Sequence, residues 1–273
     1  MVLLSPSRSL IPGLRAITLV TRNRRWIARS RLRDCFDFAR LAQPVGKGDV
    51  VVLLSHRGTK SYTVEATAVA RKLGAATVGI TGVGSPWKEG LTYRIEACEP
   101  EDTGAFTKSM TSTLAWIIRW INAPALTEEV LEACGRIQGG PGFPKVKADT
   151  DVVLLGDLER EWVAREIALK LQEAAYLRAR PFGLEEFLHG PRISVDAKSV
   201  VVAFTSAEPR WQTVRDYLKT IEVRLVEVPG AWLEQLFWGQ RFTAGACLQL
   251  DIDPDLLRAD DPRYKKAREK LSL

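Results

Sequence analysis

A polar loop after an apolar run contains residues suited to binding a phosphate group. Residues 50–54 predict a buried strand, and a helix-length amphipathic stretch begins at Ser61. A chain that runs from a strand through a glycine-bearing loop into a helix leaves backbone N–H groups and the positive end of the helix dipole available to an anion. The candidate phosphate-binding residues are Ser55, His56, Arg57, Gly58, Thr59, Lys60 and Ser61.

The same loop has a simpler interpretation. It could be a β–α turn whose hydroxyl side chains only cap the helix and whose Gly58 supplies a positive φ. The spacing matches neither the Gly-x-x-x-x-Gly-Lys-Ser/Thr phosphate loop of nucleotide-binding proteins nor the Gly-x-Gly-x-x-Gly dinucleotide fingerprint. Nucleotide binding therefore has little support, and both phosphate binding and helix capping stay open at this point.

A second candidate for chemistry is a predicted helix over residues 159–178. Glu166, Lys170 and Glu173 fall at positions i, i+4 and i+7 and so project from one face, while apolar residues line another. A carboxylate beside an ammonium can act as the base that moves a proton between adjacent carbons of a sugar, as an aldose–ketose isomerisation requires. The alternative is a salt-bridged, solvent-exposed helix face.

The third candidate is His189, one of two histidines in the chain. The sequence Leu-His-Gly-Pro at 188–191 ends a helical turn abruptly beside the imidazole. Imidazoles exchange protons near neutral pH, which suits proton transfer to the ring oxygen of an opening sugar. A purely structural histidine is the alternative.

Alternating strands and helices must position these residues. Strand-length apolar runs are followed by helix-length amphipathic stretches in both halves of the chain, which predicts an α/β fold with two lobes, each a parallel sheet flanked by helices in three αβα layers. The predicted strands are 17–20, 49–55, 76–81, 93–97, 151–155, 199–204 and 222–226, and the predicted helices are 22–41, 61–73, 105–121, 128–137, 159–178, 209–220, 232–248 and 261–273. The Gly/Pro-rich segment 139–144 marks the boundary, which gives a first lobe over 1–138, a linker over 139–150 and a second lobe with a C-terminal helix over 151–273.

Composition excludes several classes of protein. Hydrophobic residues make up 46% and charged residues 26% of 273 residues, as in ordinary globular proteins. The longest apolar runs are strand-sized, far below the roughly 18 residues that span a bilayer. Four widely spaced cysteines and two histidines suggest neither a disulfide framework nor a metal site, so we expect no metal, no cofactor and a reducing, cytoplasmic compartment.

The net charge of +6 is concentrated at the N-terminus. Residues 1–33 contain eight arginines and no acid. Such a segment could bind nucleic acid or resemble an organellar transit peptide. We do not expect nucleic-acid binding, because no recognition motif or aromatic platform accompanies the arginines. Residues 16–20 also predict a buried strand and 22–41 a helix, which would place most of the segment within the fold.

Taken together, the motifs resemble those of the sugar isomerase (SIS) domain family, specifically the tandem-SIS isomerase half of glucosamine–fructose-6-phosphate synthase and stand-alone phosphosugar isomerases and deaminases. The family loop Ser-Gln-Ser-Gly-Glu-Thr-x-x-Thr-Leu-Glu-Ala aligns without gaps with residues 55–66. A Thr-Lys pair that opens a long helix is found at Thr107 and Lys108. The family motifs Ala-x-Glu-Gly-Ala-Leu-Lys-Leu-Lys-Glu and Glu-Leu-x-His-Gly-Pro resemble residues 164–173 and 186–191.

The resemblance implies two SIS-type lobes and roles for the site residues. Glu173 would be the base that moves the proton between C1 and C2, and His189, reaching in from a partner subunit, would assist ring opening. Lys170 and Glu166 would hold them in electrostatic register, and Thr107 and Glu166 would join the substrate-binding set. The resemblance also implies a homodimer with shared active sites, a phosphorylated sugar as ligand, and no glutaminase domain before this chain.

Three departures from the family pattern bear on the substrate. Thr21–Arg25 replaces the family's Gly-x-Gly-Thr-Ser loop, and His56, Arg57 and Lys60 replace neutral residues of the phosphate loop. No residue could be assigned the role of the family's C-terminal active-site lysine. We therefore expect either an isomerase or deaminase acting on a hexose or hexosamine 6-phosphate through an enediol-type intermediate, or a non-catalytic sugar-phosphate-binding regulatory protein.

Overall fold

The computed structural model describes residues 2–5, 31–41, 45–120, 128 and 140–271. The predicted strand 17–20, the predicted helix 128–137 except for residue 128, and the loop Thr21–Arg25 lie outside this part of the chain. Two compact units are present: Met1–Asp102 with Phe106–Ala123 and Arg258–Leu273, and Thr103–Ala105 with Pro124–Leu257. The second unit thus excludes the C-terminal residues, and the domain limits inferred from the sequence stay a prediction.

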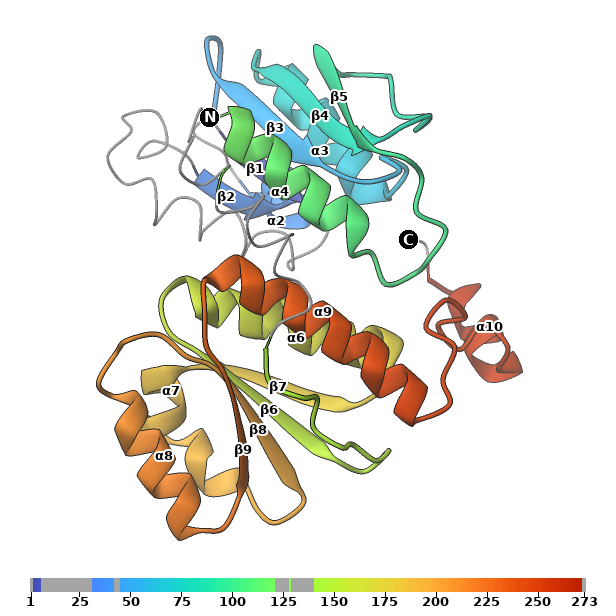
Figure 1. The fold of residues 1–273 in the computed structure, drawn as a ribbon. Helices are drawn as coiled ribbons and strands as arrows, with labels where there is room; N and C mark the ends of the chain where they lie inside the picture. The colour runs from blue at the N-terminus through green and yellow to red at the C-terminus, as the bar shows by residue number, and fades with distance from the viewer. Residues whose placement is uncertain (1, 6–30, 42–44, 121–127, 129–139, 272–273) are drawn as a thin grey trace. The chain divides into compact units, whose positions relative to one another are not determined.

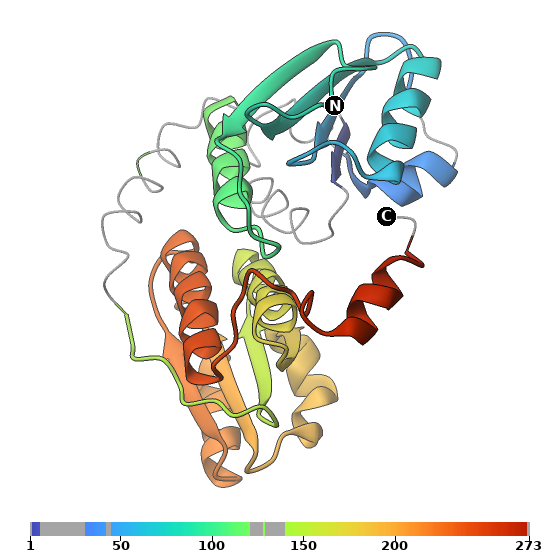
Figure 2. The ribbon, with the colours of Figure 1, turned by 90° about the vertical axis from the view of Figure 1, so that its right-hand side faces the viewer.

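The first unit contains a five-stranded parallel sheet in the order β2-β1-β3-β4-β5. Helices α2 and α3 cover one face and α4 the other (Figures 1 and 2). Alternate residues of β3, Val51 and Leu53, pack against Phe38 of α2 and Ala66 of α3. The elements are β1 (Val2–Ser5), β2 (Arg31–Asp34), α2 (Cys35–Arg40), β3 (Val50–Leu54), α3 (Ser61–Lys72), β4 (Ala76–Gly82), β5 (Tyr93–Cys98) and α4 (Lys108–Trp120).

The second unit contains a four-stranded parallel sheet in the order β7-β6-β8-β9. Helices α6 and α9 cover one face, and α7 and α8 cover the other (Figure 1). The elements are β6 (Asp151–Gly156), α6 (Glu159–Ala174), β7 (Arg178–Gly183), α7 (Leu184–His189), the 3-10 helix η1 (Pro191–Ser194), β8 (Ser199–Phe204), α8 (Trp211–Thr220), β9 (Arg224–Val228) and α9 (Trp232–Gln249). A further helix, α10 (Pro262–Arg268), lies in the C-terminal segment.

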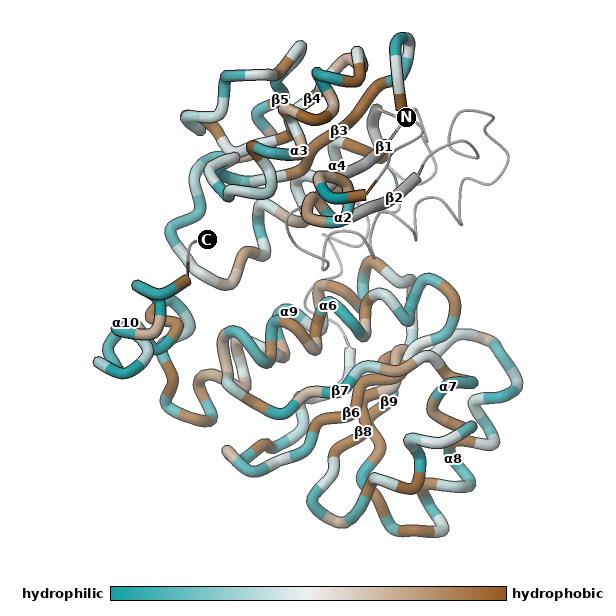
Figure 3. Tube along the Cα trace, turned by 180° about the vertical axis from the view of Figure 1, so that it is seen from behind, coloured by the Kyte–Doolittle hydropathy of each residue, from teal (hydrophilic) through white to brown (hydrophobic). Residues whose placement is uncertain are grey.

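Parallel sheets flanked by helices confirm the predicted fold class. The apolar residues gather along β3, β6 and β8, which are interior strands (Figure 3). Strands covered on both faces carry continuous apolar runs, and these runs allowed the strands to be predicted from the sequence. In the described part of the chain, no helix combines the length and apolar character needed to cross a membrane.

Two predicted helices overlap residues that form strands. Residues 31–34 of the predicted helix 22–41 form strand β2, and the helix begins only at Cys35, where the Asp34 side chain accepts a hydrogen bond from the Asp37 N–H at 2.7 Å. The predicted helix 159–178 ends at Ala174, and Arg178–Gly183 forms strand β7. Strand β7 is an edge strand that contains Pro181, so it has neither a continuous apolar run nor a clear alternation.

Candidate functional site

The loop after β3 stands at a position where parallel α/β sheets usually bind ligands. Because β1 pairs with both β2 and β3, the chain reverses its winding direction between β1 and β3. Ligands of such sheets bind outside the carboxyl ends of the strands at this switch point. Ser55 follows the last residue of β3 directly, so the loop Ser55–Ser61, here called the phosphate loop after the ligand expected from the sequence, lies at this edge.

The inner part of the phosphate loop is fixed by close packing. The Ser55 hydroxyl is buried and accepts a hydrogen bond from the Gly58 N–H at 3.1 Å. Gly58 has a φ of +66°, and a Cβ atom there would lie 2.2 Å from the Cβ of buried Trp87. This position therefore requires glycine for both its conformation and its close approach to the tryptophan.

The outer part of the phosphate loop carries the charge. The side chains of Arg57, Thr59, Lys60 and Ser61 are exposed. Lys60 is the N-cap of α3 and makes no side-chain capping bond to the helix. Among the described residues, neither Arg57 nor Lys60 forms an ion pair with an acid. Two cations that have no acidic partner in the described part of the chain thus stand beside a helix start that the side chain of its N-cap residue does not cap, an arrangement that favours an anion.

His56 points differently from its charged neighbours. Its Nε2 atom accepts a hydrogen bond from the Glu101 N–H at 3.1 Å, and its backbone carbonyl accepts bonds from the Thr81 hydroxyl at 2.7 Å and the Gly82 N–H at 2.9 Å. Burial lowers the pKa of the His56 imidazole, with Glu101 opposing the shift. The histidine ring is thus engaged by the loop that precedes α4.

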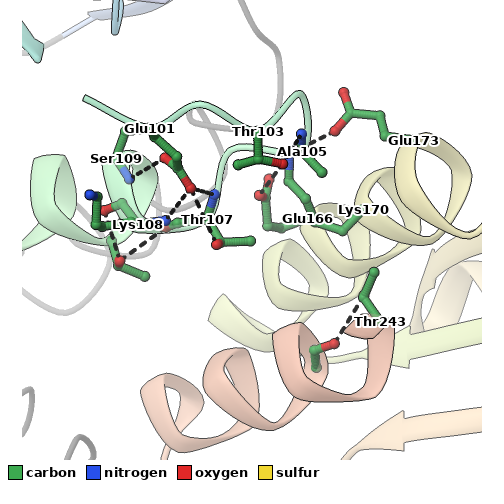
Figure 4. Close-up of polar contacts among 12 residues, drawn as sticks. Glu101, Thr103, Ala105, Thr107, Lys108, Ser109, Glu166, Lys170, Glu173 and Thr243 are labelled. Carbon is green, nitrogen blue, oxygen red and sulfur yellow. Dashed lines mark hydrogen bonds and ion pairs between the residues drawn. The ribbon is translucent and has the colours of Figure 1, made fainter. Parts of the chain in front are cut away.

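Glu101, which the sequence reasoning missed, occupies the start of α4. Its carboxylate accepts N–H bonds from Thr107 at 2.8 Å, Lys108 at 2.9 Å and Ser109 at 2.8 Å (Figure 4). Burial alone would raise the pKa of this carboxyl, but the backbone N–H groups outweigh it and the pKa lies below its ordinary value. The sequence-predicted residue Thr107 therefore donates to an internal acid. No local capping pattern identifies Glu101, because it stands well before the helix.

The structure brings together the three predicted residues of α6. The Lys170 Nζ atom lies 2.7 Å from Glu173 Oε2 and 3.8 Å from Glu166 Oε1 (Figure 4). Glu166 and Lys170 are only 3% and 4% exposed, whereas the Glu173 side chain is 36% exposed. A solvent-exposed salt-bridged face is thus the wrong description for the first two residues. The cluster is a buried ammonium with one carboxylate that reaches solvent.

His189 lies apart from that cluster within the second unit. It ends α7, on the sheet face opposite to α6, and its side chain is 81% exposed (Figure 1). Its Nε2 atom lies 3.6 Å from Glu185 Oε2 of the same helix. The helix stops at this residue, as predicted, and Pro191 then opens η1. Within one copy of the second unit, the sheet separates His189 from Glu173.

Residues 37–118 match the sequence profile of the SIS domain family. This part of the chain is similar to SIS domains. It contains the phosphate loop, Glu101, Thr107 and the first turns of α4. The profile does not extend to residues 124–257 of the second unit, where Glu166, Lys170, Glu173 and His189 lie.

Known proteins similar to the chain include sugar-phosphate enzymes and a regulator. Glutamine–fructose-6-phosphate aminotransferase [isomerizing] from Aquifex aeolicus is 25% identical over 198 residues, which are 66% of this chain and 33% of that protein. The chain thus spans about a third of the length of this relative. The HTH-type transcriptional regulator HexR from Escherichia coli is 40% identical over 68 residues, which are 25% of this chain and 23% of the regulator.

Solved structures share the fold over almost the whole chain. Glucosamine-6-phosphate deaminase from Thermotoga maritima has a TM-score of 0.74 at 17% identity and covers 93% of this chain and 87% of its own. Tagatose-6-phosphate ketose/aldose isomerase from Escherichia coli has a TM-score of 0.70 at 17% identity, with coverages of 93% and 84%. Identities this low establish the fold alone, so activity has to be argued from the residues.

Proposed function

We propose that the chain is a phosphosugar isomerase or aminosugar-phosphate deaminase that acts on a hexose or hexosamine 6-phosphate through an enediol-type intermediate. The observation that carries the proposal is the pair Lys170–Glu173. A carboxylate that reaches solvent and is fixed at 2.7 Å by a buried ammonium has the geometry of a positioned general base. The similarity to isomerizing aminotransferases supports the reaction class.

The phosphate loop would supply the binding energy. Arg57 and Lys60 would pair with the 6-phosphate, and the first N–H groups of α3 would donate to its oxygens. The hydroxyls of Thr59 and Ser61 are exposed at the same loop and would complete the shell. Anchoring the phosphate would fix one end of an open-chain sugar and so limit the conformations of its reacting carbons.

Proton transfer would then follow on the sugar. Glu173 would remove the proton from C2 of the aldose, the C1 carbonyl oxygen would gain a proton to give the enediol, and the carbon-bound proton would return to C1 as the C2 oxygen becomes the carbonyl. With a 2-amino sugar the same shift leaves an imine at C2, which water hydrolyses to the ketose and ammonia. Lys170 would hold the Glu173 carboxylate throughout.

Ring opening would require a second copy of the chain. His189 and Glu173 lie on opposite faces of the second sheet, so they cannot meet within one copy of the second unit. The exposed His189 side chain could instead enter the active site of a second copy. We therefore propose a homodimer with shared active sites and a second SIS-type lobe formed by the second unit. The overall fold likeness to the deaminase and isomerase structures supports the two-lobe arrangement.

Exchange of carbon-bound protons tests the proposal. Incubating the protein in D2O with fructose, glucose or glucosamine 6-phosphate should introduce deuterium at C1 or C2, and Glu173→Gln should abolish it because the amide cannot accept the proton. Glu161→Gln is the matched control, since Glu161 also pairs with a cation of α6, Arg165, at 2.8 Å. Absence of exchange with all three sugars in the unaltered protein would refute the catalytic proposal.

The second candidate function is a non-catalytic sugar-phosphate sensor. The observation that favours it is the 40% identity to part of a transcriptional regulator. A sensor would bind hexose 6-phosphates in a calorimeter without isomerising them, and the binding would persist in Glu173→Gln. Turnover that depends on Glu173 would exclude the non-catalytic sensor function.

A further inference from the structure

The His56 side chain occupies a fitted position inside the first unit. A Cβ atom at Gly82 would lie 2.5 Å from His56 Cε1 and 2.8 Å from Nδ1, so the imidazole fills the space that this glycine leaves. The Phe106 ring lies 5.2 Å from the imidazole, centroid to centroid. The ring is therefore held from two sides, by strand β4 and by the residue that precedes Thr107.

The hydrogen bond of the imidazole fixes its protonation state. The Glu101 N–H can only donate, so Nε2 must offer its lone pair, and the single ring proton resides on Nδ1. Nδ1 is buried and has no hydrogen-bond partner among the described residues. A second proton on the ring would remove the acceptor, so the arrangement holds only for a neutral imidazole.

The bond to Glu101 connects His56 to helix α4. The residue whose N–H is held by the imidazole is the same residue whose carboxylate accepts three N–H groups at the start of α4. The backbone of Glu101 is thus hydrogen-bonded to the phosphate loop, and its side chain is hydrogen-bonded to the start of the helix. Asp102 is the last residue of this segment in the first unit, and Thr103 belongs to the second.

Charges of both signs surround the ring. Burial has the largest influence and lowers the pKa of the imidazole. Glu101 and Asp102 raise this pKa, whereas Arg57 of the phosphate loop and Lys108 of α4 lower it further. The net effect is a lowered pKa, in agreement with the neutral form that the hydrogen bond demands.

We propose that His56 is a positioning residue: its neutral Nδ1–H imidazole locks Glu101, and with it the start of α4, to the phosphate loop and does not itself contact the phosphate. The part of this proposal that concerns phosphate rests on the proposed function of the loop. The part that concerns the imidazole and Glu101 stands independently of it.

Nitrogen NMR tests the protonation state directly. The chain has two histidines, so ¹⁵N-histidine labelling gives two ring spectra, and a His189→Gln variant assigns them. We expect His56 to be neutral and protonated on Nδ1 at pH 7, and we expect this tautomer to persist when inorganic phosphate is added. An Nε2–H or cationic His56 at this pH, or an Nε2 proton that appears on adding phosphate, would overturn the proposal.

Hydrogen exchange and phosphate binding test the positioning role. His56→Leu should expose the Glu101 amide to at least about tenfold faster exchange, whereas His56→Gln, whose side-chain oxygen can accept the same bond, should restore protection. His56→Gln should bind inorganic phosphate within about threefold of the unaltered protein, and the double variant Arg57→Gln, Lys60→Gln should bind about tenfold more weakly or worse. Equal loss of affinity in His56→Gln and the double variant would refute the proposal.

The two proposals fail in distinguishable ways. If the unaltered protein binds no phosphate, the proposed phosphate loop is wrong, while the imidazole spectrum and the Glu101 exchange rate still decide the role of His56. If phosphate binds normally and the Glu101 amide exchanges equally in the unaltered, His56→Leu and His56→Gln proteins, the positioning role is wrong and the proposed function is untouched.

Discussion

Removal of the Glu101 carboxylate should release the first turn of α4. The carboxylate accepts three backbone N–H groups at 2.8–2.9 Å, and the residue is 7% exposed. A hydrogen bond to a charged group contributes about 1.5–3 kcal/mol, and loss of a helix N-cap costs about 0.5–2 kcal/mol. Water can replace part of the lost interaction because the Lys108 side chain is exposed. We therefore expect Glu101→Ala to destabilise the helix start by about 2 kcal/mol.

Amide hydrogen exchange measures this effect locally. A loss of about 2 kcal/mol corresponds to roughly thirtyfold faster exchange at the Thr107, Lys108 and Ser109 amides, if these open by fraying of the helix. Glu99→Ala is the matched control, since Glu99 is an exposed acid in the same loop. Protection of α3 should be the same in both variants.

The effect should also depend on pH, because the pKa of Glu101 is lowered in the folded protein. A carboxyl with a lowered folded-state pKa contributes stability above its ordinary pKa and loses it as the pH falls through the folded value. The difference between the unaltered protein and Glu101→Gln should therefore shrink in acid below the ordinary glutamate range. Equal exchange at Thr107–Ser109 in Glu101→Ala and Glu99→Ala at pH 7 would refute the reasoning.

Three further substitutions have defined outcomes. Gly58→Ala should destabilise the first unit by at least about 1 kcal/mol in urea unfolding, since the new Cβ meets Trp87 at 2.2 Å and the φ of +66° disfavours alanine; an unchanged midpoint would contradict this. Leu158→Gly should stabilise the second unit by about 1 kcal/mol, because Leu158 has φ 48° and ψ –122° and is 69% exposed; a lower melting temperature would contradict this. Lys170→Met should cost about 3 kcal/mol, because it removes a buried ammonium between two carboxylates, whereas Lys147→Met, at an exposed site, should be neutral; equal unfolding midpoints for the two would contradict this.

The positions of most regular elements could be predicted from the sequence. Strand β8 was predicted at its observed limits, and α3 to within a residue, because an interior strand must be apolar throughout and an amphipathic helix has a local period. Strands β1, β2 and β7 were missed. Strands β2 and β7 lie at a sheet edge, where one side lacks a neighbouring strand and the residues can be charged or include proline, whereas β1 is an interior strand of only four residues.

The identities and spacing of the candidate site residues could also be predicted from the sequence, but their burial and their contacts with other elements could not. The i, i+3 spacing of Lys170 and Glu173 predicted their contact, because side chains three residues apart lie next to each other on a helix. That Lys170 is buried follows only from packing, and that His189 faces away from Glu173 follows only from which side of the sheet each helix covers.

By itself, the sequence determined the α/β class, the strand–loop–helix order around residues 55–61 and the Glu-Lys-Glu spacing on one helix, because each depends on neighbours within a few residues along the chain. Tertiary structure decided that Glu101 caps α4 and that His56 turns inward to hold it. The His56–Glu101 contact joins residues 45 positions apart, and no local pattern encodes such a distance. Only the register of the parallel strands, which brings the ends of β3, β4 and β5 to one edge, places the two residues within a hydrogen bond of each other.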